Sequence, residues 1–504
     1  MSHTCPEGGV GSFKKGNYMK RREFSKSIVL FGLGAQTGLE PTIGRASEKQ
    51  QSYYEEPAKK LPARKFDVVV AGGGTAGIFA AMAAARHGAK TMLIESKGYC
   101  GGVAVEGGTA IHSFYNLYTG FENCTKRKVV QGIPAEFMDR LTEMGGATGY
   151  PEMETGRDYD AVCTAVDTEL YKLLAFRMLK EAGVFIAVNT MLADAIMDGG
   201  RLKGVITESR SGREAVMADS FVDSTGYGDL CSHAGAQYQV PNDYDSCNSF
   251  GFANASIDDY YEFLKSNDAV GQVCRGPRSS EDNKFVRMGA EQLNIPGLMD
   301  EARKIGLSLV TTTVRDNYLM YIKCNYKVPG TVIDRDDMAQ AEVEIRSRME
   351  KAAGLLRKYV PGFEKAFIAR TSPAMVIRRG RQIVCEYDIT HEDVINGRHF
   401  EDDTFVYGFH DSAPRFQIKD GGTYGIPYRA LCVKGVDNLY ATGMMITSDR
   451  RAHMSTRNTV SCMGQGQAAG TAAALCAKKK IGSRDLKYAD LRTQLLKGKV
   501  YFES

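Results

Sequence analysis

Several signatures of metal, nucleic-acid and membrane proteins are missing from this 504-residue sequence. Its twelve cysteines include no C-x-x-C pair and it has only eight histidines, which argues against a zinc site or a thioredoxin-like motif. A net charge of +4 gives no reason to expect nucleic acid, which normally requires a concentrated basic face. No apolar run reaches the roughly 20 residues of a membrane span. With 43% hydrophobic and 25% charged residues, the composition is that of a globular protein large enough for two structural units.

A dinucleotide-binding βαβ unit is the clearest motif that is present. Residues 66–96, FDVVVAGGGTAGIFAAMAAARHGAKTMLIES, read as a buried strand, a glycine turn, a small-residue helix and a second strand. Gly72, Gly74 and Gly77 fit G-x-G-x-x-G, which permits a tight turn, close approach to a pyrophosphate and close helix packing. Glu95 follows Gly72 by 23 residues and can accept hydrogen bonds from ribose hydroxyls. The alternative is a glycine turn with no ligand.

Further blocks extend the pattern along the chain. They are SKGYCGGVAVEGGTA, FVDSTGYGDLCSHAG, KYVPGFEKAF, GRQIVCEYDITHEDVINGRHF and, near the C-terminus, NLYATGMMITSDRRAHMSTRNTVSCMGQGQAAGTAAAL. In this order they resemble the bacterial FAD-dependent oxidoreductase family, which has a glutathione-reductase-like fold and is distantly related to fumarate reductase flavoprotein subunits. The resemblance covers about residues 66–480. It implies FAD as cofactor and an α/β fold: an FAD-binding Rossmann-like domain with an interleaved α+β substrate domain.

The resemblance also implies how the two domains share the chain. The FAD domain takes residues 64–115, 161–240 and 425–495, and the substrate domain takes 116–160 and 241–424. Within them we expect a helix and strand from Asp167, a hairpin closed by Gly199-Gly200, and a charged helix ending before Pro361. A second G-x-G-x-x-G unit is lacking, so no separate NAD(P)H domain is expected.

The residues expected to contact FAD lie in four glycine-rich segments. They are Gly72, Gly74, Thr75, Ala76 and Gly77; Glu95, Ser96, Gly101, Gly102 and Val103; Thr225 and Gly226; and Gly443, Gly466, Gln467 and Ala468. A helix beginning at GQGQAAG is expected to point its N-terminus at the flavin's pyrimidine edge, where its dipole stabilises negative charge. The alternative is an ordinary packing helix. Cys100 has no second cysteine nearby and is read as a packing residue.

Catalytic candidates are the polar side chains that the resemblance places around the flavin ring. They are Arg378, Arg381, His410, His453 and Arg457, whereas Arg429 is expected to be structural. Histidine can exchange a proton near neutral pH, and arginine can hold a carboxylate in a bidentate grip. His453 and Arg457 are four residues apart and share a face if their segment is helical. Each candidate could instead be a structural histidine or an ion-pair arginine.

The N-terminal region reads as an export signal and a linker, residues 1–63. In residues 19–35, MKRREFSKSIVLFGLGA, Arg21 and Arg22 precede a short apolar run and resemble a twin-arginine signal. This route carries folded proteins, which suits an enzyme that acquires its flavin before crossing. The alternative is a basic stretch before a partly apolar helix, in a cytoplasmic protein.

Together these features predict an FAD-dependent oxidoreductase that transfers a hydride between flavin N5 and a small polar or anionic substrate, a carbohydrate or an organic acid. Its partners would be this substrate and an electron acceptor or donor that the sequence does not name; no metal, nucleic acid or integral membrane span is expected. Three alternatives stay open: an unsaturated-carboxylate reductase, a lyase or hydratase with structural FAD, and a noncatalytic binding protein.

Overall fold

The structure is a computed structural model that describes residues 54–106, 111–117, 124–150, 153–155, 163–290, 293–411 and 418–503. The predicted export signal at residues 19–35 lies outside these ranges. Within them, no helix is both long enough and apolar enough to cross a membrane.

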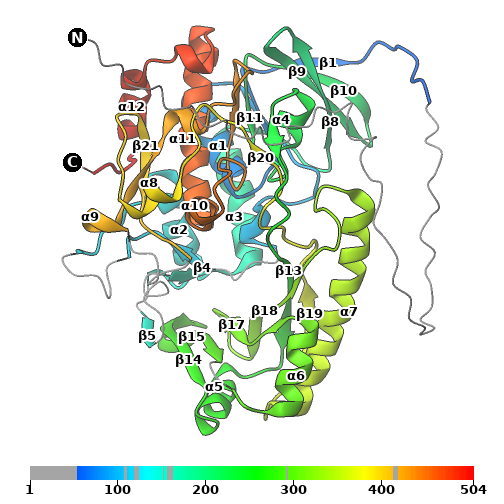
Figure 1. The fold of residues 1–504 in the computed structure, drawn as a ribbon, viewed down its shortest axis with the longest axis vertical. Helices are drawn as coiled ribbons and strands as arrows, with labels where there is room; N and C mark the ends of the chain where they lie inside the picture. The colour runs from blue at the N-terminus through cyan, green and yellow to red at the C-terminus, as the bar shows by residue number, and fades with distance from the viewer. Residues whose placement is uncertain are drawn as a thin grey trace, which may run out of the picture.

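A five-stranded parallel sheet forms the centre of the upper half of the molecule in Figure 1. Its order is β23 (Leu439–Ala441), β11 (Ser220–Asp223), β2 (Val68–Ala71), β3 (Thr91–Ile94) and β7 (Phe185–Ala187). Strands β2, β3, β11 and β23 are fully buried, as their continuous apolar sequences predict for a parallel sheet. Parallel pairing brings the carboxyl ends of the strands to one edge, and the glycine turns follow there.

Helices α1 (Thr75–Arg86) and α11 (Thr459–Lys479) lie side by side next to this sheet (Figure 1). Glycines allow their close approach. A Cβ at Gly466 would lie 2.1 Å from the carbonyl oxygen of Ala76, and one at Gly470 would lie 2.1 Å from that of Ala80. Helix α3 (Thr168–Glu181) precedes β7, so the predicted helix and strand after Asp167 are confirmed, and Asp167 caps that helix.

A second sheet contains the predicted hairpin. Its order is β1 (Ala63–Lys65), β10 (Gly212–Met217), β9 (Arg201–Ser209) and β8 (Met191–Asp198). Asp198 pairs with Arg201 across Gly199-Gly200, which confirms the turn.

Two further four-stranded sheets occur in the chain. They lie with helices in the lower half of Figure 1. One sheet has the order β16 (Leu307–Ser308), β18 (Tyr318–Tyr326), β13 (Ser246–Ala253) and β19 (Phe367–Thr371); the other has β17 (Val310–Thr312), β15 (Glu281–Ala290), β14 (Val270–Arg278) and β5 (Met153–Thr155). The helices are α5 (Ile257–Ser266), α6 (Pro296–Ile305) and α7 (Arg335–Tyr359). The last confirms the predicted charged helix.

The described residues also form smaller elements. They are β4 (Ile111–Ser113) with β6 (Cys163–Ala165), β12 (Tyr238–Gln239) with β20 (Gln382–Ile383), β21 (Asp403–Tyr407) with β22 (Tyr424–Pro427), α2 (Ile133–Glu143), α4 (Asp229–His233), α8 (His391–Ile395), α9 (Lys419–Gly422), α10 (Arg450–Thr456), α12 (Tyr488–Lys497) and the 3₁₀ turns η1 (Gly102–Ala104), η3 (Tyr428–Ala430) and η4 (Ser483–Asp485).

Two hydrophobic clusters group these elements. The second cluster runs from Phe250 to Ile377, inside the predicted substrate domain. The first contains the FAD-domain elements and also Phe114 to Ala147 and Ile383 to Tyr428, segments assigned from the sequence to the substrate domain. Thus α2 and the β21–β22 hairpin share the core of α1 and α11, and the exact domain boundaries stay a prediction.

Candidate functional site

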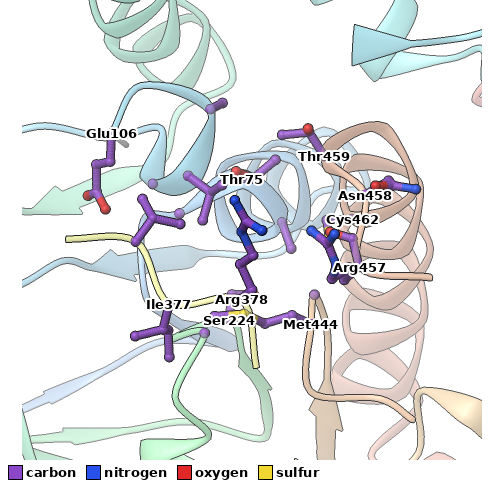
Figure 2. A pocket seen from close by; sticks show the side chains of 18 of the residues that line it. Thr75, Glu106, Ser224, Ile377, Arg378, Met444, Arg457, Asn458, Thr459 and Cys462 are labelled. Atoms are coloured by element: carbon purple, nitrogen blue, oxygen red, sulfur yellow. The ribbon is translucent and has the colours of Figure 1, made fainter. Parts of the chain in front are cut away.

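A cavity of about 800 Å³ is lined by the glycine turns of the parallel sheet and by residues of strands β13, β15 and β18. This volume is within the usual range for cofactor and substrate pockets. Of the residues predicted to contact FAD, eleven line it: Gly72, Gly74, Thr75, Ala76, Glu95, Ser96, Gly102, Val103, Thr225, Gly226 and Gly443. Figure 2 shows part of this cavity, with Thr75, Ser224 and Met444 around it.

The turn after β2 leaves no space for side chains at two of its glycines, as the G-x-G-x-x-G pattern predicts. Gly72 has φ +95°, and a Cβ there would lie 2.4 Å from the carbonyl oxygen of Ser224. A Cβ at Gly77 would lie 1.8 Å from the carbonyl oxygen of Gly72, so Gly77 serves helix packing and does not line the cavity. Helix α1 starts after Gly74 with no side-chain cap and no acidic residue in its first turn. Its N-terminal N–H groups and positive dipole end are therefore suited to a pyrophosphate.

Glu95 stands at the end of β3 with its carboxylate at the cavity. Its Oε2 accepts a hydrogen bond from the Gly73 N–H at 2.8 Å, and Oε1 accepts one from the Lys97 N–H at 2.8 Å. These bonds fix the carboxylate and leave lone pairs for ribose hydroxyls. Cys100, nearby, is fully buried and burial raises the pKa of its thiol to about 12, so its surroundings are those of a packing residue. Gly101 has φ +132° and donates its N–H to Gly73 without lining the cavity.

The buried carboxylate of Asp223 fixes the glycine turn that follows β11. Asp223, at the end of β11, accepts hydrogen bonds from the N–H and Oγ1 of Thr225, at 2.9 and 2.8 Å, and from the Cys231 N–H at 2.8 Å. This arrangement presents Thr225 and Gly226 to the cavity. Burial raises the pKa of Asp223.

The last segment differs from its sequence prediction. Helix α11 begins at Thr459, five residues before the predicted start, and Asn458, Thr459 and Val460 are the residues that line the cavity at its N-terminus. Figure 2 places Asn458 and Thr459 there. The sequence prediction placed the start of the helix at the alanine- and glycine-rich segment, because Thr459 and Val460 have a low helix propensity. Tertiary packing overrides this propensity in the structure.

Gly466, Gln467 and Ala468 consequently sit inside α11 and do not line the cavity. Gly466 packs on α1, as described above. Gln467 accepts a hydrogen bond from the Ile133 N–H at 2.9 Å and donates one to the carbonyl of Gly498 at 3.1 Å, and Ala468 is buried. These three residues serve the helix–helix and helix–loop contacts of the FAD domain.

Two predicted catalytic residues reach the cavity. Arg378 and Arg457 line it, and Figure 2 shows both guanidinium groups directed into the space. Arg378 donates to Asn325 Oδ1 at 3.2 Å. Arg457, the residue after α10, forms an ion pair with Asp411 and lies 5.7 Å from the ring centre of Tyr244.

The other three predicted catalytic residues are not among those that line the cavity. His453 is fully buried, its Nε2 lies 2.8 Å from the carbonyl oxygen of Arg378, and burial beside Arg457 holds its pKa well below the usual range. His410 is fully buried too, and burial lowers its pKa to about 4. Arg381 donates to Asp229 at 2.8 Å and to the carbonyl of Tyr227 at 2.9 Å. The α10 segment is helical as the i, i+4 argument requires, but the histidine points into protein.

Arg429 has the structural environment expected of it. It forms an ion pair with Asp402 at 2.8 Å and lies over the rings of Tyr387 and Phe400. Across the described ranges, no cluster of three or more histidine, cysteine, aspartate or glutamate residues could hold a metal ion.

Sequence reasoning missed three cations of the cavity: Lys97 after β3, Arg287 on β15 and Lys323 on β18. Burial, together with Arg378 and Arg287, lowers the pKa of Lys323 to about 8. Arg287 is buried and donates toward Thr312 Oγ1 at 3.5 Å. One signal was readable: Lys323 is the only charged residue in the strand YLMYIKCNY.

The fold and cavity are those of a flavoprotein. The chain matches the family described as FAD dependent oxidoreductase over residues 67–495 and belongs to it. The protein is therefore an FAD-dependent oxidoreductase. The observed cradle fits the cofactor: the uncapped start of α1 and the Gly72 turn suit the pyrophosphate, and Glu95 suits the adenosine ribose.

Among solved structures, the fold is similar to a geranylgeranyl bacteriochlorophyll reductase-like protein from Thermoplasma acidophilum (13% identity, 86% of this chain and 83% of the other, TM-score 0.44). It is also similar to p-nitrophenol 4-monooxygenase from Pseudomonas putida (12% identity, 87% of this chain and 86% of the other, TM-score 0.43). A third similar structure is a flavoprotein/dehydrogenase from Cytophaga hutchinsonii (11% identity, 86% of this chain and 84% of the other, TM-score 0.42). These values describe a distant resemblance only.

Proposed function

We propose that this FAD-dependent oxidoreductase transfers a hydride between flavin N5 and a small anionic substrate, an organic acid in preference to a neutral carbohydrate. The observation that carries the proposal is the presence of Arg378 and Arg457 in the cavity that the dinucleotide turns also line. When bound, FAD supplies the hydride acceptor or donor. The chain's own residues then have to bind and orient the substrate.

The two arginines have different partners. Arg378 donates a hydrogen bond to the neutral Asn325 side chain, and Asp411 and Asp245 act on its charge from nearby. Its guanidinium lines the cavity, where a substrate carboxylate can reach it. Arg457 already pairs with Asp411, which orients the guanidinium and leaves part of its donor fork for the substrate. A bidentate arginine–carboxylate contact fixes the orientation of the substrate as well as binding it.

Neither histidine is proposed as the proton carrier. A general acid or base needs to reach the proton it exchanges and to titrate near the working pH. His453 and His410 lie outside the cavity lining, and burial depresses the pKa of both. We assign His453 a positioning role, because its Nε2 lies within hydrogen-bond distance of the backbone carbonyl of Arg378. Its ring centre also lies 5.4 Å from that of Tyr244.

The experiment is anaerobic photometric titration of the purified yellow protein with small carboxylic and hydroxy acids and with neutral sugars. A substrate should bleach or recolour the flavin stoichiometrically. Bleaching by a saturated acid and recolouring of reduced protein by an unsaturated acid would separate oxidation from unsaturated-carboxylate reduction. Turnover with no flavin colour change would instead favour a lyase with structural FAD.

Arginine variants test the binding assignment. Arg378→Ala or Arg457→Ala should weaken substrate binding about ten- to hundredfold, the value of one charged hydrogen-bond contact, and should keep the FAD spectrum. Arg450→Ala is the matched control, because Arg450 lies on α10 but is exposed and pairs with Asp243 at 3.4 Å. Unchanged KM in both arginine variants would exclude this substrate site, and loss of FAD would assign them to the cofactor scaffold.

A further inference from the structure

Lys323 presents an amine to the cavity from strand β18. On this strand Ile322 and Cys324 pack with helices α6 and α7 in the second hydrophobic cluster. Because side chains alternate between the two faces of a strand, Lys323 points away from that cluster. Asn325 lies on the same face as Lys323 and accepts a hydrogen bond from Arg378. The amine therefore shares the side of the sheet to which a proposed substrate-binding arginine is anchored.

The amine of Lys323 has no acid to hold its proton. Its side chain makes no hydrogen bond or ion pair with any residue in the described parts of the chain. Its neighbours across the two ladders, Ser249 on β13 and Ser308 on β16, are uncharged. Burial without a carboxylate partner favours the neutral form of an amine, which can accept a proton.

The titratable groups that act on Lys323 come from several elements. They are Arg378 in the segment after β19, Cys247 on β13, Arg287 on β15 and Arg457 after α10. Strands β16 and β17, which also adjoin β18, contain no acidic or basic residue. Burial, with the three arginines, lowers the pKa of Lys323 to about 8, so the amine changes its charge near neutral pH. Both proposed substrate-binding arginines are thus within electrostatic range of it.

The acids that line the cavity already have basic or backbone partners. Glu95 accepts hydrogen bonds from two backbone N–H groups. The others are in the ion pairs Glu106–Lys97, Asp229–Arg381 and Asp411–Arg457. A carboxylate beside a cation is a weak base, because the cation favours its charged form.

Two further cavity groups stay protonated near neutral pH. Burial raises the pKa of the Cys462 thiol to about 12, and it also raises the pKa of the Tyr227 hydroxyl. His112 lines the cavity as well and is the competing candidate for proton exchange.

We infer that Lys323 is the catalytic residue that exchanges a proton with the substrate during hydride transfer. The inference rests on the proposed function for the anionic substrate. In oxidation of a hydroxy acid, the C–H hydride carries two electrons to FAD and the neutral amine takes the O–H proton. A C=O bond forms and Lys323 becomes an ammonium group. In the reverse reaction, the ammonium group returns the proton as the hydride adds to carbon.

The pH dependence of turnover tests this role. The value of kcat/KM reports groups of the protein before substrate binds, and there the pKa of Lys323 is about 8. Oxidation needs the neutral amine, so kcat/KM should rise with pH and level off above pH 8. Reduction needs the ammonium form and should show the opposite dependence. A profile without an inflection near pH 8 would overturn the inference.

Trace labelling with acetic anhydride follows the amine without turnover, because only a neutral amine reacts. Peptide mass spectrometry of FAD-loaded protein labelled over a range of pH gives the midpoint for Lys323. We expect a midpoint of about 8, against ~10.4 for an ordinary lysine. A midpoint at the ordinary value, or no labelling at any pH, would refute the assignment.

Variants separate proton exchange from charge. Lys323→Arg keeps the positive charge but cannot accept a proton, so it should slow kcat about 10²–10⁴-fold, leave KM within a few-fold and remove the inflection. Lys265→Met, on the exposed surface of α5, is the control and should match wild type. His112→Gln should keep the inflection. If His112→Gln removes it and Lys323→Arg does not, His112 is the proton carrier and the inference is wrong.

The outcomes distinguish this inference from the proposed function. If no anionic compound changes the flavin colour, the proposed function fails and the role of Lys323 fails with it. If an anion is turned over with a pH profile that Lys323→Arg leaves unchanged, the proposed function stands and the role of Lys323 alone is refuted.

Discussion

At the residue scale, Glu95 shows how one side chain can both shape a turn and face a ligand. Its two oxygens accept hydrogen bonds from the backbone N–H groups of Gly73 and Lys97. The same carboxylate is therefore preorganised before a ribose arrives, which lowers the entropic cost of binding.

We expect Glu95→Ala to weaken FAD retention about ten- to hundredfold, because a charged hydrogen-bond acceptor is lost. Dialysis followed by flavin fluorescence of the released cofactor measures the effect. Glu95→Gln is the matched control, since it keeps one acceptor oxygen and should lose less. Retention equal to wild type in Glu95→Ala would remove Glu95 from the cofactor site.

The buried His410 makes the free energy of unfolding depend on pH. His410 has its pKa lowered to about 4 by burial, from 6.5 in the unfolded chain. Between these values the unfolded state binds a proton that the folded state refuses. The stabilising contribution of neutral His410 is therefore complete above pH 6.5 and is lost as the pH falls toward 4.

We predict that wild type loses about 2 kcal/mol more stability between pH 7 and pH 5 than His410→Gln does. Urea unfolding at both pH values, followed by far-UV circular dichroism, gives the two differences. A parallel pH dependence in wild type and variant would mean that His410 titrates normally in the folded protein.

At the element scale, glycines decide how closely the two central helices approach. Gly470 lies inside α11 against the Ala80 carbonyl of α1, with no room for a Cβ. Gly354 lies inside α7 with no atom within 4 Å of a Cβ position, so nothing in the packing requires glycine there. Two glycines in similar helical positions thus have opposite packing environments.

Gly470→Ala should destabilise the protein by about 1–3 kcal/mol, since the methyl group forces α1 and α11 apart. Gly354→Ala should stabilise it by about 0.5–1 kcal/mol, because alanine is the better helix former. Thermal or urea denaturation of both variants checks the pair. An equal effect of the two substitutions would contradict the close packing of α1 on α11.

Elements with a local signature were predictable. The Gly199-Gly200 hairpin, helix α7 and the βαβ unit were each read from periodicity and turn residues. The start of α11 was not, because its first residues have no strong helix propensity and lie next to α10, which depends on tertiary contacts such as His453 with the carbonyl of Arg378.

At the scale of the whole molecule, the cavity lies between two bodies with separate hydrophobic clusters. The first body supplies the dinucleotide turns and the second supplies Lys323 and Arg287. Both bodies therefore contribute residues to one cavity, and Arg457 of the first body faces it together with the cations of the second.

Export is a prediction about the whole precursor, and its residues lie outside the described ranges. Replacing Arg21 and Arg22 by Lys should keep the precursor in the cytoplasm with FAD bound, because the export machinery reads the arginine pair. Cell fractionation of a bacterial host measures this, with flavin absorbance as the folding control. Unchanged export of the double variant would exclude the twin-arginine route.

The sequence by itself determined the cofactor class and much of the FAD domain. Glycines at Gly72, Gly74 and Gly77 and an acid at Glu95 are set by local chain geometry, so a short stretch is enough to predict their structure. Only the tertiary structure decided which cations line the cavity. Lys323, Arg287 and Arg378 are brought together by strand pairing and by the docking of the two bodies, and whether a side chain reaches a cavity or is buried beside it, as His453 is, depends on contacts far away along the chain.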